Sequence, residues 1–219
     1  MDKARWLDLM SKLGLPPNEE TFEALLKAYS ETHRHYHTVE HIDHCLRELD
    51  AEISLAREPA EVELALWLHD AVYNPHRSDN EQKSAELACK LGDIPRERGV
   101  SPCFPGERGM SPGSDRTARV HAHIMATRHE APAVDPDSQL VVDIDLSILG
   151  ASETEYARFE ENVRKEYRWV PSMIFRHKRA EILESFLARS HIYYTEAFRA
   201  KYERQARQNL SNAIAILRR

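Results

Sequence analysis

The most apolar stretch of the chain, residues 62–72, includes a histidine followed by an aspartate, His69-Asp70. A helix that is apolar on nearly all of its faces belongs in the interior of a protein. An imidazole and a carboxylate buried there cost several kcal/mol unless something satisfies them. A divalent cation shared with other acids and histidines is one way to satisfy both groups.

The rest of the chain favours helix. It is rich in Ala, Leu, Glu and Arg and has only seven glycines in 219 residues, a composition typical of helical proteins. Residues 140–149 could be a strand by composition, but the leucines and the helical surroundings favour a helical turn. We expect an all-α fold, a helical bundle with one metal site between helices, in a single domain of residues 1–219. Apolar spacing and capping residues predict helices near residues 3–13, 19–30, 38–53, 59–74, 79–91 and 115–129, from 152 onward, and at 171–190 and 195–217.

Two segments of this expected domain differ from the rest. Residues 92–114 hold nine glycines and prolines and keep no apolar period, which predicts a long loop. It is either a lid or, as the better-supported reading, an insertion. Residues 152–219 form a basic helical part, in which residues 158–219 carry fourteen Lys and Arg against seven Asp and Glu. That part could hold phosphate, although solvated helix faces are the better-supported explanation for most of its charge.

Charge and cysteine usage restrict the class of protein. The net charge of −6 argues against a general nucleic-acid binder, and the basic part leaves nucleic-acid cleavage open. No run of 18 apolar residues and no signal-peptide core occurs, so no membrane partner is expected. The cysteines Cys45, Cys89 and Cys103 form no CxxC pair. We therefore expect neither a zinc–thiolate site nor a disulfide framework, and a reducing cytoplasm as the location.

Two histidines upstream of the apolar stretch, His37 and His41, stand four residues apart. Thr38 between them is a good helix N-cap, so His37 would precede the helix and His41 would lie in its first turn. Residues four apart project toward one side of a helix. His41 can then coordinate a metal while His37 reaches past it toward a bound substrate.

Downstream lies a third acidic element, Asp143-Ile144-Asp145. His69 and Asp70 differ by about 100° around a helix, and both can still reach one metal beside it. Asp145, or less favourably Asp143, completes the set. Two imidazoles and two carboxylates with open positions suit one divalent cation, namely Mn, Fe, Co, Ni, Zn or Mg. Such an ion lowers the pKa of water and polarises a phosphoryl oxygen.

This ordered set of residues resembles that of the HD superfamily of metal-dependent phosphohydrolases. The chain is most similar to an uncharacterised bacterial group described as predicted metal-dependent HD-superfamily phosphohydrolases. The resemblance covers most of the chain except residues 92–114. The stretches that carry it are Arg34–Ile42, Ala65–Tyr73, Ser78–Ala85, Ile124–His129, Asp143–Gly150 and Arg164–Tyr167.

The resemblance implies an all-helical fold with one metal centre between helices. By position, His41, His69, Asp70 and Asp145 would be the metal ligands. In the similar phosphodiesterase motif Tyr-His-Asn-x-x-His, the first histidine protonates the leaving group and the second binds the metal. This carries the acid role to His37, for which a surface histidine that caps a turn is the alternative.

Further polar residues are candidates for the site. Glu81 can orient water or act as general base, and its alternative role is an acid that favours a helix start. A solvated surface position is the alternative for His129 and for the basic residues. The candidate substrate-binding residues are Arg34, Asn80, His129 and Lys165.

The primary hypothesis is a hydrolase of a phosphate ester or phosphoanhydride, acting on a small nucleotide-like phosphorylated substrate. One alternative is a di-iron HD-type oxygenase, and another is a non-catalytic scaffold that binds metal or nucleotide. The oxygenase would need further histidines, and the available ones are His76, His121, His123 and His129. Of these, we expect His121 and His123 to lie on a solvated helix face. A homodimer stays open.

Overall fold

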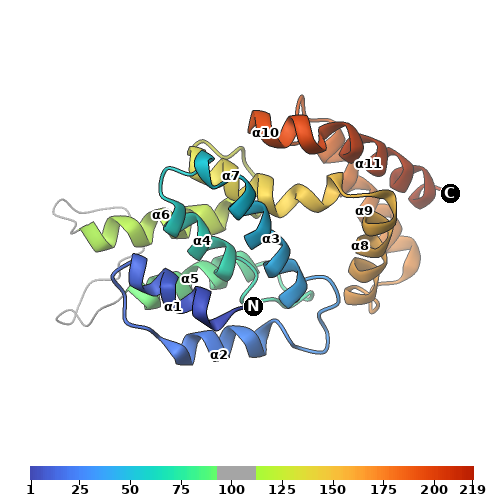
Figure 1. Ribbon diagram of the computed structural model, residues 1–219. Helices are drawn as coiled ribbons and strands as arrows, with labels where there is room; N and C mark the ends of the chain where they lie inside the picture. Colours follow the sequence, from blue (N-terminus) through green and yellow to red (C-terminus); the bar gives the residue numbers. More distant parts are fainter. Residues whose placement is uncertain (93–111) are drawn as a thin grey trace. The chain divides into compact units, whose positions relative to one another are not determined.

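The computed structural model describes residues 1–92 and 112–219, and these residues form helices and no strand (Figure 1). The expected all-α fold class is confirmed. Residues 93–111 of the expected loop lie outside the described residues, so the role of this loop stays a prediction. The main helices are α1 (Lys3–Lys12), α2 (Glu19–Ala28), α3 (Val39–Ala51), α4 (Pro59–Leu68), α5 (Asn80–Gly92), α6 (Pro112–Ala126), α7 (Pro136–Asp145), α8 (Glu153–Glu166), α9 (Ser172–Leu187), α10 (Glu196–Phe198) and α11 (Arg204–Leu217).

The chain divides into two compact units. The first consists of Met1–Glu31 and His37–Val142, and the second of Thr32–Tyr36 and Asp143–Arg219. Helix α7 therefore begins in the first unit and ends in the second. The expectation of a single domain stays a prediction.

Helix α4 is the centre of the first unit. All of its residues from Glu61 to Leu68 are buried, and α1, α3, α5 and α6 pack around it (Figure 1). Its Trp67 meets Trp6 of α1 edge to face, with ring centroids 5.4 Å apart, and Tyr29 donates its hydroxyl to the Trp67 carbonyl. The sequence, which is apolar on nearly all faces of this helix, therefore predicted its burial correctly, because no side of the segment Glu61–Leu68 is exposed to solvent.

Two acids within α4 are neutralised where they are buried. Glu61 accepts two hydrogen bonds from the Arg119 guanidinium at 2.6 and 2.7 Å, and Glu63 accepts one from Arg5 at 2.7 Å. Paired arginines remove the cost of an isolated buried carboxylate. These pairs tie α4 to α6 and α1.

The end of α4 differs from the sequence-based expectation. We expected the helix to continue to Asn74-Pro75, but it ends at Leu68. The N–H of Ala71 bonds to the Leu68 carbonyl at 2.9 Å, a tighter turn than the α-helix. The N–H of Val72 is taken by the Ser84 hydroxyl of α5 at 3.0 Å. Contacts from α5 thus replace the helical bonds, and the prediction of the helix end was wrong.

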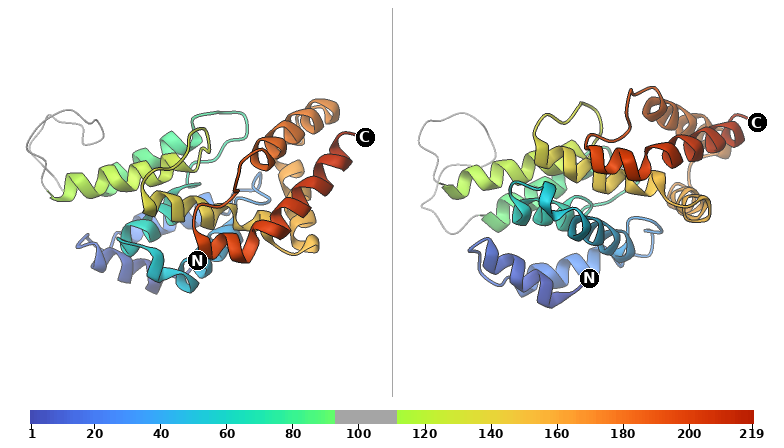
Figure 2. Two further views of the ribbon diagram at one scale, coloured as in Figure 1. Left: turned by 90° about the horizontal axis from the view of Figure 1, so that it is seen from above. Right: turned by 45° about the horizontal axis from the view of Figure 1, so that its top comes forward.

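Two arginines of the second unit bond to backbone carbonyls at or near helix ends. Arg164 donates to the Tyr167 and Val170 carbonyls, and Arg176 donates to the Ile216 and Leu217 carbonyls at the end of α11. Helices α9 and α11 lie side by side in this unit (Figure 2). Part of the basic charge therefore satisfies carbonyls that a helix end leaves unbonded.

The described helices and Cys45 bear on the expectations about membranes and cysteines. None of the helices in residues 1–92 and 112–219 combines the length and apolarity that crossing a bilayer requires. Cys45 is a buried thiol outside any disulfide.

His123 on α6 is buried, with 2% of its surface exposed, so its assignment to a solvated face was wrong. Its Nδ1 lies 2.8 Å from the Ser138 hydroxyl, and its Nε2 has no hydrogen-bond partner in the described part of the chain. Burial lowers the pKa of His123, although the carboxylates of Asp135, Asp137 and Glu61 oppose this. The folded protein therefore favours the neutral imidazole.

This burial predicts a pH dependence of stability. A histidine in the unfolded chain titrates near about 6.5. As pH falls through that value, the unfolded chain takes up a proton that folded His123 resists. The free energy of unfolding should then fall by up to about 1.4 kcal/mol per pH unit relative to His123→Leu. Urea unfolding of both proteins between pH 8 and 5 measures the difference in their free energies of unfolding. The contributions of titratable groups that the two proteins share cancel in this difference.

His177 is an exposed histidine on α9, and His177→Gln is the matched control. It should follow the wild-type pH profile. Parallel profiles for wild type and His123→Leu would contradict the prediction.

Candidate metal centre

The first turn of α3 supplies His41. Helix α3 begins after Thr38 in the N-cap position, as the sequence predicted, and this places His41 in the first turn. The His41 side chain is buried, with 3% of the residue exposed. His37 precedes the helix, so the two histidines keep the expected order along the chain.

The end of α4 supplies His69 and Asp70. The Nδ1 of His69 lies 3.0 Å from the Leu66 carbonyl, which can only accept a hydrogen bond. The proton on the ring is therefore assigned to Nδ1, and Nε2 presents its lone pair. Metal-binding histidines are commonly oriented by such a bond from their other ring nitrogen.

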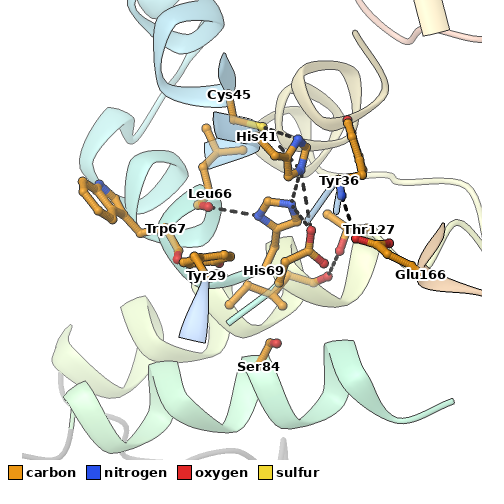
Figure 3. A network of polar contacts seen from close by, with 12 residues as sticks. Tyr29, Tyr36, His41, Cys45, Leu66, Trp67, His69, Ser84, Thr127 and Glu166 are labelled. Atoms are coloured by element: carbon orange, nitrogen blue, oxygen red, sulfur yellow. Dashed lines mark hydrogen bonds and ion pairs between the residues drawn. The ribbon is translucent and has the colours of Figure 1, made fainter. Parts of the chain in front are cut away.

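Two further ligand atoms lie close to this lone pair, so that three candidate ligand atoms lie together. The Nε2 of His69 lies 3.1 Å from the Nε2 of His41 and 3.1 Å from Oδ2 of Asp70, and the last pair, His41 Nε2 and Asp70 Oδ2, is 3.5 Å apart. Figure 3 shows His69 between the Leu66 carbonyl and the His41 ring. Neighbouring nitrogen or oxygen ligands on a tetrahedral zinc are about 3.3 Å apart, given the usual bond lengths. The three separations therefore fit ligands of one ion.

The charges at this point also fit a cation. A lone pair on His69 Nε2 would face a carboxylate oxygen, and only a second proton on the ring or a cation makes that contact favourable. Burial alone would raise the pKa of Asp70, whereas His69, His37 and His41 in their protonated forms would hold it below its ordinary value. Asp70 is thus an ionised carboxylate beside two imidazoles, which is a donor set suited to a divalent metal.

Cys45 adds a sulfur to the same place. It follows His41 by four residues on α3, and its Sγ lies 3.8 Å from both ring nitrogens of His41. His41, Cys45 and His69 are all buried, their ligand atoms lie within 4.8 Å of one another, and the group could hold a metal ion. Sequence reasoning missed Cys45 because it fitted the apolar stripe of α3. The His-x-x-x-Cys spacing was the available signal.

His37 lies close to this cluster. Its ring stacks on that of Tyr73 at a centroid distance of 4.2 Å and an angle of 28°, and its ring centroid is 6.1 Å from that of His41. Its effect on the Asp70 pKa places it within electrostatic range of the carboxylate. The structure thus brings His37 beside the metal ligands of the first unit. Tyr73 was not predicted from the sequence.

Glu81, at the start of α5, belongs to the same polar group. Burial raises the pKa of Glu81, and the negative charge of Asp70 adds to the effect, while Arg128 and His129 oppose it. His129 follows α6 and has a left-handed φ of 57°. A residue other than glycine in that region costs of order 1 kcal/mol. Here it accompanies the end of α6, where the N–H of His129 bonds to the Ala126 carbonyl at 3.2 Å.

Other predicted residues lie elsewhere. Asn80 uses its amide to hold the backbone of Asn74, with both bonds at 3.0 Å, which is a structural role beside the expected substrate contact. Lys165 is exposed and pairs with Glu161. Arg34, Lys165 and Asp145 belong to the second unit, and their part in the site stays a prediction.

Asp143 has a different task. Its carboxylate accepts from the backbone N–H groups of Tyr194 and Thr195 at 2.7 Å each and from the Thr195 hydroxyl. These bonds anchor the segment before α10 in the second unit. Of the two aspartates left open by the sequence, Asp145 is therefore the better candidate for a ligand.

The extra histidines of the oxygenase reading are not gathered. His76 is exposed, and His123 is bonded to Ser138. Within the described residues, the group with the burial and spacing of a metal site is His41, Cys45 and His69. Comparison of the chain with protein-family models, curated proteins and solved structures finds no match in any of the three. The residues themselves therefore carry the functional argument.

The cluster predicts that a divalent metal stabilises the fold. At a free concentration about 100 times the dissociation constant, binding adds about 2.7 kcal/mol to the free energy of unfolding. We expect Zn(II) or Co(II) to raise the thermal midpoint, a chelator to reverse the rise, and His69→Gln to abolish it. The exposed His177→Gln variant should keep the full response. An equal response in His69→Gln would place the metal elsewhere.

Proposed function

We propose that this chain is a metal-dependent phosphohydrolase acting on a phosphate ester or phosphoanhydride of a small nucleotide-like molecule. The observation that carries the proposal is the convergence of His41 Nε2, His69 Nε2 and Asp70 Oδ2 within 3.5 Å of one another in the first unit. Two imidazoles and one carboxylate leave coordination positions open, which catalysis requires and a closed structural site lacks.

The ion would be held by His41, His69 and Asp70, with Asp145 added by the family resemblance. When bound, a divalent metal polarises a phosphoryl oxygen and lowers the pKa of water. The hydrogen bond from His69 Nδ1 to the Leu66 carbonyl orients the ring, and in the neutral imidazole it leaves Nε2 as the nitrogen available to the metal. The phosphate chemistry comes from the resemblance, and the metal chemistry comes from these contacts.

His37 is the proposed general acid. In this role it donates a proton to the leaving oxygen, which needs a ring held in one orientation beside the reacting group. The stack on Tyr73 supplies that orientation. We assign to Glu81, whose pKa is raised by burial and by Asp70, the role of accepting a proton from the attacking water.

Arg128 and His129 lie within electrostatic range of Glu81. A phosphoryl group is anionic; a guanidinium group offsets its charge, and an imidazole N–H can donate a hydrogen bond to it. We assign substrate contact to His129.

Loss of the central carboxylate should abolish turnover. The metal-loaded protein is assayed against nitrophenyl phosphates and a panel of nucleotides, beside Asp70→Asn and the control His177→Gln. We expect Asp70→Asn to lower kcat/KM by at least about 100-fold, because second-shell changes alone cost 10–100-fold. Equal negligible turnover by wild type and Asp70→Asn with every metal would refute the proposed activity.

The acid role of His37 is separated from binding by the leaving group. A nitrophenolate leaves readily without a proton, whereas an alkoxide does not. We expect His37→Gln to lower kcat by about 10²–10⁴-fold on alkyl phosphates and much less on nitrophenyl phosphate. An equal loss on both substrates would show that His37 does not protonate the leaving group.

A further inference from the structure

Cys45 is placed more specifically than a core residue requires. It is fully buried and lies one helical turn after His41, on the side of α3 that carries this ligand. Figure 3 shows its sulfur beside the His41 ring. The sulfur therefore belongs to the same small group as the two imidazoles.

The separations match those around one ion. With zinc–sulfur and zinc–nitrogen bonds of usual length, a tetrahedral site places sulfur about 3.6 Å from a nitrogen ligand. Cys45 Sγ lies 3.8 Å from His41 Nε2. It also lies 3.8 Å from Nδ1, so it faces the ring as a whole. A turn about the Cα–Cβ bond of Cys45 is needed to bring the sulfur to the Nε2 side.

We propose that Cys45 is a ligand of the metal ion held by His41, His69 and Asp70. The inference rests on the metal centre of the proposed function. With Cys45 bound, the ion has four protein ligands, so hydrolysis would require a fifth position for water or a phosphoryl oxygen, which zinc can take by expanding from four ligands to five. On binding, the thiol S–H bond breaks, its proton leaves to solvent, and the sulfur electron pair forms the bond to the metal. No oxidant or reductant takes part.

A thiolate ligand changes which metal the site prefers. Cysteine sulfur favours thiophilic ions such as Zn(II) and Co(II), whereas Mg(II) and Mn(II) prefer oxygen. The site would then select against the two harder ions in the set that the sequence left open. The alternative is a thiol that packs on the ring as a small apolar group.

Absorption spectroscopy with Co(II) distinguishes the two. The full-length reduced chain is titrated with Co(II), and a thiolate bound to cobalt gives an intense charge-transfer band in the near ultraviolet. We expect the band to saturate at one cobalt per chain, to be absent in Cys45→Ser and Cys45→Ala, and to disappear when Zn(II) is added. Cys45→Ala should also weaken Zn(II) binding at least about tenfold, with Mn(II) binding changed less than about threefold.

Each remaining outcome overturns the inference in a distinct way. Cobalt bound at one site in wild type without the band, or a band kept in Cys45→Ala, would show that Cys45 is not a ligand while the metal centre stands. No cobalt binding by wild type would remove the metal centre together with the inference. Where a Cys45 variant folds poorly, a wild-type chain that binds cobalt without the band still overturns the inference.

Discussion

The site depends on the hydrogen bond from His69 Nδ1 to the Leu66 carbonyl. This bond assigns the ring proton and turns the Nε2 lone pair toward His41 and Asp70. It exists because α4 ends at Leu68, which leaves the carbonyls of its last turn without helical partners. The end of one helix thus supplies both the orienting acceptor and the two adjacent ligands.

Burial of α4 makes that arrangement rigid. Packing on all sides, with Glu61 and Glu63 neutralised by arginines, holds the helix end in place. Helix α3 brings His41 and Cys45 to it, and contacts from α5 close the turn that follows. A buried polar group of this kind is costly unless fully satisfied, and a cation satisfies the imidazoles and the carboxylate together.

Part of the account could be predicted from the sequence. The apolar stretch predicted a buried helix, and Thr38 predicted the start of α3 and the place of His41. The actual end of α4 could not be predicted, because Ser84 captures the next backbone N–H from a distant part of the chain. Cys45 looked like a core residue, since periodicity reports burial and not what a buried side chain contacts. The bonds of Asp143 to Tyr194 and Thr195, which separate its role from that of Asp145, join residues 51 and 52 positions apart in the chain.

The proposed function requires one metal ion bound by His41 Nε2, His69 Nε2 and Asp70 Oδ2. A high-resolution crystal structure of the Co(II)- or Zn(II)-loaded protein, with anomalous scattering recorded on both sides of the metal absorption edge, tests it most directly. We expect a single anomalous peak about 2.0–2.2 Å from each of these atoms. A peak elsewhere, or a His69 Nε2 bonded to a protein group with no metal beside it, would show that the three atoms do not bind one ion.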